Sequence, residues 1–412
     1  MKICLVCDTK KGLHPVWSGA EQVCESLADM LGGMGHEVIY LTVEQQRGEE
    51  MEKVYPVRLY PRNITQGSNV TSMLSFLSVY SILKKTKPDI VHIHAKALFL
   101  PVFFACKVQK IPIAYTVLDY NLICPNNTVI KPDGSICETA QHPGCGRCME
   151  EKNASANILK KVIRGLYFRM RYLIYKAAAG KIDAVITLSH ASKARLINAS
   201  VPESNIRVIY HYQPRLQEIP EVPLKGERPL NILFVGALYP HKGGHIVVEA
   251  MKYVAKEVPE AMLRIIGTGN DKEYKNRIDK IIRNNNLGNN IEFLGHLENE
   301  KVFGVMKSCG LVFVPEQWPN EFGPVILVEA MSLGKIVVAS HIGATSEFIE
   351  HGVSGFLVPH SSARAFADQA VYIYNNKELE STMGKKAKES IQHISQNLCS
   401  RDIQKLYSII SR

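Results

Sequence analysis

The sequence predicts an α/β protein made of two doubly wound halves, and three observations lead to this fold class. Short β-branched runs recur between longer helical patterns, several of the runs are continuously apolar, and the pattern stops and restarts around residues 213–230. Continuously apolar runs are typical of parallel strands that helices cover on both faces. The length of 412 residues also favours more than one domain, since a typical domain has about 150 residues.

The strand predictions divide the chain into an N-terminal domain (1–212), a linker (213–230) rich in Pro and charge, and a C-terminal domain (231–393). Stretches between the strands, such as Gly244–Val258, have the amphipathic pattern of helices. A last helix, at about 394–412, is expected to pack back on the first domain. Ligands of such sheets bind at the carboxyl ends of the strands, so we expect the active site in the inter-domain cleft. The predicted strands are Lys2–Asp8, Glu37–Val43, Ile90–Ala95, Ile111–Val117, Ala184–Ser189, Ile206–Tyr210, Asn231–Ala237, Ala261–Gly267, Asn290–Gly295, Leu311–Glu316, Lys335–Ser340 and Gly355–Pro359.

The composition is that of an ordinary globular protein, with 46% hydrophobic and 21% charged residues, and it excludes a disordered chain or a small disulfide scaffold. The net charge of +10 favours polyanions, acidic lipid surfaces or anionic substrates without choosing between them. Asp8 interrupts the apolar start, and no apolar run reaches the roughly 18 residues of a membrane span. We therefore expect a cytoplasmic protein whose cysteines are thiols or metal ligands rather than disulfides.

The strongest chemical signal lies between Val314 and Glu329, where a strand is followed by a loop and a helix that begins at about Pro324. The amides of Val325 and Ile326 are placed to bind an anion at the positive end of the helix dipole. Glu329 lies one turn further, where a carboxylate can accept hydrogen bonds from a vicinal diol such as a ribose. The alternative is that Glu321 and Glu329 are only solvated charges, but Phe322-Gly323-Pro324 between them strengthens the functional interpretation.

Two further loops follow predicted strands of the same domain. The first contains Gly236, then Lys242 and a glycine pair that opens a helix, and its lysine is suited to hold a diphosphate as a point charge. The second is Ile265–Gly269, a glycine turn, which is weak evidence by itself. Without its neighbours Lys242 would be interpreted as an ordinary surface lysine.

Together these motifs resemble the family 4 retaining glycosyltransferases of the GT-B fold, which consist of two Rossmann-like domains. The glutamate pair Glu321 and Glu329, separated by seven residues around Phe-Gly-Pro-Val, matches the signature of that family. The resemblance covers nearly the whole chain. The other matching segments are Trp17–Glu21, Pro88–His94, Ala184–Leu196, Asn231–Gly244, Ile265–Gly269, Gly343–Glu347 and Gly352–Gly355.

The resemblance implies transfer of a sugar, with retained anomeric configuration, from a UDP- or GDP-linked donor to a glycan, lipid-linked or other hydroxyl acceptor. It assigns catalytic roles to Glu321, which contacts the donor sugar, and Lys242, which neutralises the leaving diphosphate. Glu329 would bind the ribose, and His94 and Asp119 would lie on the acceptor side. No cofactor or metal would be needed for catalysis. The implied donor-binding residues are Gly19, Gly236, Lys242, Gly267, Gly295, Glu321, Phe322, Gly323, Val325, Ile326 and Glu329.

Two residues depart from the family pattern. Ala237 stands where the family usually has an arginine, so that Lys242 carries the phosphate charge alone or with help from His241. Leu118 stands where a histidine usually touches the donor sugar, which favours a less polar donor such as a deoxy or pentosyl sugar. Both departures keep open a non-catalytic nucleotide-sugar-binding or partner-binding protein of the same fold. An NAD-linked oxidoreductase or an epimerase is disfavoured, because the first strand lacks a Gly-x-Gly-x-x-Gly turn.

Four cysteines, Cys124, Cys137, Cys145 and Cys148, fall in one loop-like segment. Four thiolates around Zn²⁺ would hold together a loop that lacks its own core, so we predict a structural zinc. The alternative is four independent thiols.

The segment Ile158–Ala179 mixes basic and apolar residues in a helical pattern. A basic amphipathic helix can lie on anionic lipid, which would place the protein peripherally on the inner face of a membrane. An ordinary surface helix is an equal alternative. We expect no nucleic-acid partner, since the basic residues are not interleaved with a stacking aromatic platform.

Overall fold

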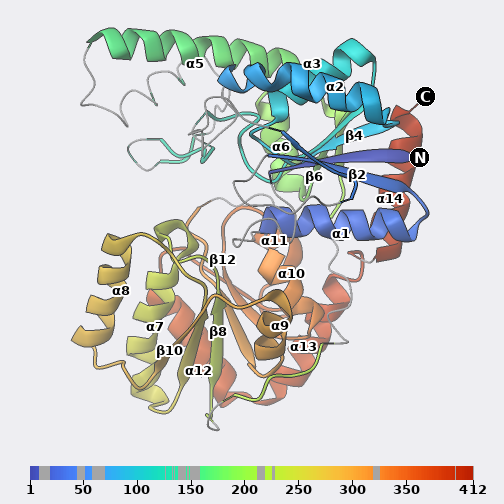
Figure 1. The fold of residues 1–412 in the computed structure, drawn as a ribbon. Coiled ribbons are helices and arrows are strands. Elements are labelled where there is room, and N and C mark those ends of the chain that lie inside the picture. Colours follow the sequence, from blue (N-terminus) through green and yellow to red (C-terminus); the bar gives the residue numbers. More distant parts are fainter. Residues whose placement is uncertain are drawn as a thin grey trace. The chain divides into compact units, whose positions relative to one another are not determined.

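The computed structural model divides the chain into two compact units (Figure 1). One unit comprises Met1–Tyr212 and Gln396–Arg412, and the other comprises Gln213–Ser395. The structure describes residues 1–8, 19–43, 52–57, 70–125, 127–131, 133, 135–137, 145, 148, 158–210, 219–224, 228–318, 325–394 and 396–411.

The first unit is built on a seven-stranded sheet with the order β3-β2-β1-β4-β5-β6-β7. Every strand pair is parallel, and the register places Ile3 opposite both Val38 and Ile90. Relative to the chain this is the 3-2-1-4 order of a doubly wound fold, which reverses direction between β1 and β4. The strands are β1 (Lys2–Cys7), β2 (Glu37–Val43), β3 (Val54–Val57), β4 (Ile90–Ile93), β5 (Ile113–Thr116), β6 (Ala184–Thr187) and β7 (Ile206–Val208).

Helices cover this sheet. Leu27 and Leu31 of α1 share one buried cluster with Leu406 of α14 and with Ile3 and Leu5 of β1. In a second contact, the ring of Phe99 in α3 lies 5.2 Å from that of Tyr115 in β5. The helices of this unit are α1 (Gly19–Gly33), η1 (Val70–Ser75), α2 (Phe76–Thr86), α3 (Phe99–Gln109), α5 (Ile158–Ala179), α6 (His190–Asn198), η2 (Glu203–Asn205) and α14 (Gln396–Ile410).

The second unit repeats the plan with a six-stranded parallel sheet in the order β10-β9-β8-β11-β12-β13. The helices α7, α8 and α12 form one core with the sheet, in which Met251, Phe313 and Phe366 are almost fully buried. The strands are β8 (Asn231–Val235), β9 (Met262–Ile266), β10 (Ile291–Gly295), β11 (Leu311–Val314), β12 (Ile336–Ser340) and β13 (Phe356–Val358). The helices are η4 (Pro240–Lys242), α7 (Gly244–Glu257), α8 (Lys272–Asn284), α9 (Asn299–Lys307), α10 (Val325–Ser332), α11 (Thr345–Phe348), α12 (Ala363–Asn375) and α13 (Glu378–Ser390).

The predicted fold class, two parallel α/β domains, is confirmed. All twelve predicted strands are present, Glu37–Val43 with the predicted bounds and the other eleven with slightly shorter ones. One strand, β3, was not predicted. It has four residues, includes Pro56 and lies at the edge of the sheet, where a residue without an N–H is tolerated. Residues 219–224, within the predicted linker, contact α9 through a hydrogen bond from the amide of Val222 to Gly304 O (3.1 Å). Among the described helices, none is long and apolar enough to cross a bilayer.

The expectation that the cysteines are all thiols or metal ligands is wrong for one pair. Cys7 ends β1 and Cys24 lies in α1, and the two form a disulfide. Both side chains are buried where α1 packs on the sheet, so the fold itself brings the two sulfur atoms together. The expected redox compartment carries no information about which cysteines the fold brings close together, so it could not predict this pair.

Breaking this disulfide should destabilise the first unit. Its cysteines are 17 residues apart, and a crosslink that closes a loop of this length contributes about 3 kcal/mol by restricting the unfolded chain. We expect Cys24→Ser to lower the urea midpoint of the wild-type protein under oxidising conditions. In dithiothreitol the midpoints of the two proteins should approach one another. An unchanged midpoint of the wild-type protein on reduction would contradict the prediction.

Candidate functional site

Three of the glycines predicted to bind the donor lie at the carboxyl edge of the second sheet. Gly236 follows β8, Gly267 follows β9 and Gly295 ends β10, which are neighbouring strands. The amide of Gly236 donates to Ile266 O (2.9 Å), and that of Gly267 donates to Gly295 O (2.8 Å). The strand order reverses between β8 and β11, which is where open α/β sheets bind ligands.

Two glycines allow the loops at this edge to pack backbone against backbone. Gly267 has φ +136°, and a Cβ there would lie 2.0 Å from Gly236 O. Gly243 has φ +71°, and a Cβ there would lie 1.9 Å from Pro315 O, in the loop that follows β11. Any side chain at either position would force these loops apart. The glycines therefore fix the relative position of the three loops that follow β8, β9 and β11.

Lys242 ends η4 in the loop after β8, and its Nζ lies 2.7 Å from Oε1 of Glu316, which follows β11. The Glu316 side chain is only 8% exposed, whereas that of Lys242 is 32% exposed. The ion pair thus joins the loops on both sides of the point where the strand order reverses. Sequence reasoning identified Lys242 but missed Glu316, because its partner lies 74 residues away in the sequence.

His241, proposed as a possible second phosphate contact, is not suited to add positive charge. Its ring lies 5.2 Å from the ring of Trp318 and stacks on Tyr239 at 6.0 Å. Burial, together with the neighbouring Lys242 ammonium, lowers the pKa of His241, so the imidazole is neutral near pH 7. Its backbone oxygen instead accepts a hydrogen bond from the amide of Gln317 (2.9 Å).

The helix α10 follows β11 and begins at Val325, so Val325 and Ile326 lie in its first turn, as predicted. Glu329 lies one turn further along the helix and is 5% exposed, which removes the alternative that it is a solvated surface charge. Glu321, Phe322 and Gly323 lie outside the described residues.

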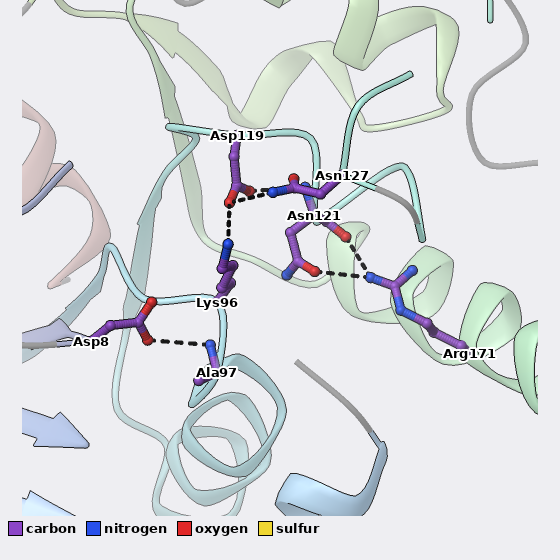
Figure 2. Close-up of polar contacts among 7 residues, drawn as sticks. All are labelled: Asp8, Lys96, Ala97, Asp119, Asn121, Asn127 and Arg171. Atoms are coloured by element: carbon purple, nitrogen blue, oxygen red, sulfur yellow. Dashed lines mark hydrogen bonds and ion pairs between the residues drawn. The ribbon is translucent and has the colours of Figure 1, made fainter. Parts of the chain in front are cut away.

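In the first unit, a polar cluster lies at the carboxyl ends of β1, β4 and β5 (Figure 2). Lys96 Nζ is 3.8 Å from Oδ2 of Asp119, and the amide of Ala97 donates to Oδ1 of Asp8 (3.4 Å). Asp119 also accepts hydrogen bonds from the amide of Asn121 (2.9 Å) and from Nδ2 of Asn127 (3.0 Å). Of this cluster, sequence reasoning had selected only Asp119.

Arg171 of α5 extends this network. Its Nη2 donates to both the backbone oxygen (2.8 Å) and the Oδ1 (3.0 Å) of Asn121 (Figure 2). Its guanidinium also lies 4.0 Å above the ring of Tyr175. The arginine is 4% exposed. It therefore anchors the loop that carries Asp119 to the inner side of α5.

His94, the other predicted acceptor-side residue, lines a cavity of about 50 Å³ in the first unit. Its ring lies 4.4 Å from that of His92. His92 is fully buried, and its ring nitrogens lie 2.6 Å from the hydroxyls of Tyr407 and Thr116. Burial lowers the pKa of His92 well below its ordinary value, so it is neutral. Gly19 is the first residue of α1, the helix that follows β1.

The ionisation of Asp8 should make stability depend on pH. Burial, opposed by the Lys96 ammonium, raises the pKa of Asp8 to about 6. Between about pH 4 and pH 6 the folded chain therefore holds a proton that the unfolded chain has released, and the free energy of unfolding falls as the pH rises. We expect Asp8→Asn to raise the urea midpoint at pH 7.5 and to flatten this fall. The exposed Asp29→Asn should retain it, and equal profiles of both variants would contradict the assignment.

The four cysteines predicted to bind zinc are all among the described residues. Cys145 is buried, and the amide of Cys137 donates to Val129 O (2.6 Å). Within the described segments, no group of three or more His, Cys, Asp or Glu side chains is arranged to hold a metal ion. A zinc ion at Cys124, Cys137, Cys145 and Cys148 stays a prediction.

Both units are Rossmann-like, and in the second unit a lysine and the start of a helix lie where the strand order reverses. These features together define a class of protein. The family model described as "Glycosyltransferase Family 4" matches residues 17–211, and "Glycosyl transferases group 1" matches residues 216–390. The chain belongs to the family 4 glycosyltransferases. The resemblance drawn from the motifs is thereby confirmed.

Curated relatives agree with this membership. The chain is 31% identical over 261 residues to an uncharacterized glycosyltransferase of Methanocaldococcus jannaschii, covering 63% of this chain and 67% of that protein. It is 26% identical over 181 residues to a phosphatidyl-myo-inositol mannosyltransferase of Mycolicibacterium smegmatis, covering 44% of this chain and 45% of the relative. The matched part thus spans two thirds of the first relative and under half of the second.

Solved structures share the fold over nearly the whole chain. HepE of Anabaena in complex with UDP-glucose matches with a TM-score of 0.72 at 18% identity and covers 99% of this chain and 100% of that one. Sucrose-phosphate synthase of Thermosynechococcus elongatus matches with a TM-score of 0.71 at 17% identity and covers 99% and 98%. At such identities the likeness establishes the GT-B fold alone.

Proposed function

We propose that the protein transfers a sugar from a UDP- or GDP-linked donor to a hydroxyl group of a glycan or lipid-linked acceptor, with retained anomeric configuration. The observation that carries this proposal is the placement of Lys242 in the second unit. The lysine lies in the loop after β8 and pairs with Glu316 in the loop after β11, and α10, the helix that follows β11, begins at Val325. A cation and free helix amides are the groups that bind a diphosphate.

The proposed chemistry breaks the bond between the anomeric carbon and the diphosphate oxygen and forms a bond to the acceptor oxygen. Negative charge develops on the departing diphosphate, and an oxygen of that diphosphate takes up the proton that the acceptor hydroxyl loses. Lys242 and the amides of Val325 and Ile326 are the groups we assign to that charge, and Glu329 is assigned to the ribose. We assign the acceptor to the first unit, where Asp119 and Lys96 offer hydrogen bonds to hydroxyl groups. Closure of the two units would exclude water.

The test is an assay of nucleotide-sugars without and with acceptor. Release of UDP or GDP from the matching nucleotide-sugar, and transfer to an alkyl glycoside acceptor with the anomeric configuration of the donor, would support the proposal. NMR spectroscopy of the product distinguishes retention from inversion. A product of inverted configuration would refute retention. Turnover of UDP-glucose equal to that of its deoxy analogues would refute a donor selected by the apolar Leu118.

A non-catalytic nucleotide-sugar-binding protein is the second candidate, favoured by Leu118 and Ala237 at positions where the family usually has polar side chains. The Lys242–Glu316 ion pair adds to it, since a diphosphate must compete with a carboxylate 2.7 Å from the ammonium. Thermal-shift stabilisation by a nucleotide-sugar without any hydrolysis or transfer would favour this candidate. Hydrolysis, even slow, would favour the enzyme.

Two finer features belong to the same proposal. We propose that the protein works peripherally at the inner face of a membrane, with an acceptor that is carried by lipid. We also propose a structural zinc in the segment of Cys124–Cys148, with no cofactor in the transfer itself. Elemental analysis of protein purified without chelator tests the zinc, and protein free of metal would refute it.

A further inference from the structure

The helix α5 has a broad apolar stripe on its outer side. With 3.6 residues per turn, five large apolar side chains fall within an arc of about 100°. Their exposed fractions are 54% for Val162, 59% for Ile163, 64% for Leu166, 45% for Met170 and 59% for Leu173. Single exposed apolar residues are ordinary, but a contiguous stripe of this kind marks an interaction surface.

The opposite side of the same helix already makes the contacts that hold it in the fold. Phe168, Arg171, Tyr175 and Ala178 are buried, and they fall about half a turn away from the stripe. The ring of Tyr175 lies 5.3 Å from that of Phe99 in α3, and Arg171 binds Asn121. The core therefore uses one side of α5, whereas the side chains of the stripe stay largely exposed.

The charged residues of α5 indicate which kind of partner surface the apolar stripe would contact. The sequence of α5 contains no Asp or Glu, whereas Lys or Arg stands at positions 160, 161, 164, 169, 171 and 176. Arg169 and Lys176 are exposed, and both fall about 80° from the centre of the stripe, along one border. An apolar stripe with a basic border matches the boundary of an anionic bilayer, where acyl chains lie below negative headgroups.

We propose that α5 lies flat on an anionic lipid surface, with Val162, Ile163, Leu166, Met170 and Leu173 inserted below the headgroups and Arg169 and Lys176 on the phosphates. This inference names the contact surface for the membrane association proposed above and rests on that part of the proposed function. The helix lies along one side of the first unit, next to α3 (Figure 1).

A membrane bound to α5 would also lie close to the polar cluster of the first unit. Arg171 on its inner side binds Asn121, and Asn121 in turn donates its amide to Asp119, which pairs with Lys96 (Figure 2). Only a few residues therefore separate the lipid-facing side of the helix from the groups assigned to the acceptor. A hydroxyl at the headgroup of a lipid-linked acceptor would then meet Asp119 and Lys96 close to the bilayer surface.

The test is co-sedimentation of the full chain with vesicles of phosphatidylglycerol and phosphatidylcholine, compared with vesicles of phosphatidylcholine alone. We expect binding to the anionic vesicles only. Leu166→Ser with Leu173→Ser should weaken it by at least about tenfold, since the two leucines together contribute more than about 1.4 kcal/mol. The matched control is Ile409→Ser on α14, which is 50% exposed and should bind like the wild type. Arg169→Gln with Lys176→Gln should weaken binding about fivefold per charge at low salt.

Three outcomes would overturn the proposal. The first is that the wild type does not bind anionic vesicles, and the second is that the Ile409→Ser control loses as much binding as the leucine variant. The third is that the wild type is a dimer and the leucine variant a monomer, which would assign the stripe to a second copy of the chain. Hydrolysis of a panel of UDP- and GDP-linked sugars without vesicles should be equal in the wild type and the leucine variant. That measurement separates the two proposals, because failed hydrolysis with intact vesicle binding refutes the transferase function and leaves the lipid-binding surface standing.

Discussion

Lys242→Ala is expected to reduce turnover by about 10²–10³ while the chain still folds. The lysine is the cation that we assign to the departing diphosphate, and loss of one preorganised partner of developing charge typically costs that factor. The effect should be large because Ala237 leaves no neighbouring arginine and His241 is neutral near pH 7. Initial rates of UDP or GDP release at saturating donor measure it.

The ion pair with Glu316 complicates this variant and also supplies its control. Removal of Lys242 leaves a carboxylate that is 8% exposed without its partner, which costs about 1–3 kcal/mol of folding stability. The double variant Lys242→Ala with Glu316→Gln removes that buried charge. We expect it to recover the urea midpoint and to remain inactive. Recovery of turnover together with stability would show that Lys242 acts only through folding.

Lys256→Ala is the matched control for the charge itself. Lys256 is exposed in the last turn of α7, the helix that begins two residues after Lys242 and ends at the other edge of the sheet. It changes the net charge by the same amount without touching the loops after β8 and β11. Wild-type turnover is expected, and an equal loss in both variants would mean that the overall charge of the protein, rather than Lys242, attracts the donor.

The fold could be predicted from the sequence because the pattern of each segment and the order of the segments along the chain indicate the same architecture. The continuous apolar runs of Leu311–Val314 and of residues 336–339 are typical of strands buried on both faces, and a chain that alternates such strands with helices forms parallel sheets. The edge strand Val54–Val57 escaped, because four residues that include a proline carry no periodic signal. Its place in the sheet comes from pairing with β2 rather than from its own sequence.

Residues of the site could be predicted from the sequence only where they belong to a recognisable motif. Lys242 and Glu329 stand at spacings that have chemical meaning, so they could be selected from the chain alone. Glu316 and Lys96 act through partners that lie 74 and 23 residues away in the sequence, and no local pattern announces such a pair. The disulfide between Cys7 and Cys24 escaped for the same reason, since it depends on the packing of α1 against β1.

Glu321→Ala is expected to be the second variant with a large loss, about 10²–10³ in turnover. By the family pattern its carboxylate accepts hydrogen bonds from hydroxyls of the donor sugar, and a bond to an ionised acceptor is about twice as strong as a neutral one. Because catalysis depends on interactions that strengthen in the transition state, loss of this carboxylate should lower kcat more than it weakens ground-state binding.

A comparison with Glu329→Ala separates the two glutamates of the signature. Glu321 is assigned to the transferred sugar and Glu329 to the ribose. UDP keeps the ribose but lacks the transferred sugar, so it should bind Glu321→Ala like the wild type but bind Glu329→Ala more weakly. Calorimetric titration of UDP, together with kcat for the nucleotide-sugar, measures both effects. Glu300→Ala, at an exposed position in the first turn of α9, is the control that should change neither. If Glu321→Ala kept turnover within about threefold of the wild type, the signature would no longer support a transferase, because a site that reacts without its sugar-binding carboxylate does not use the geometry we assign to it.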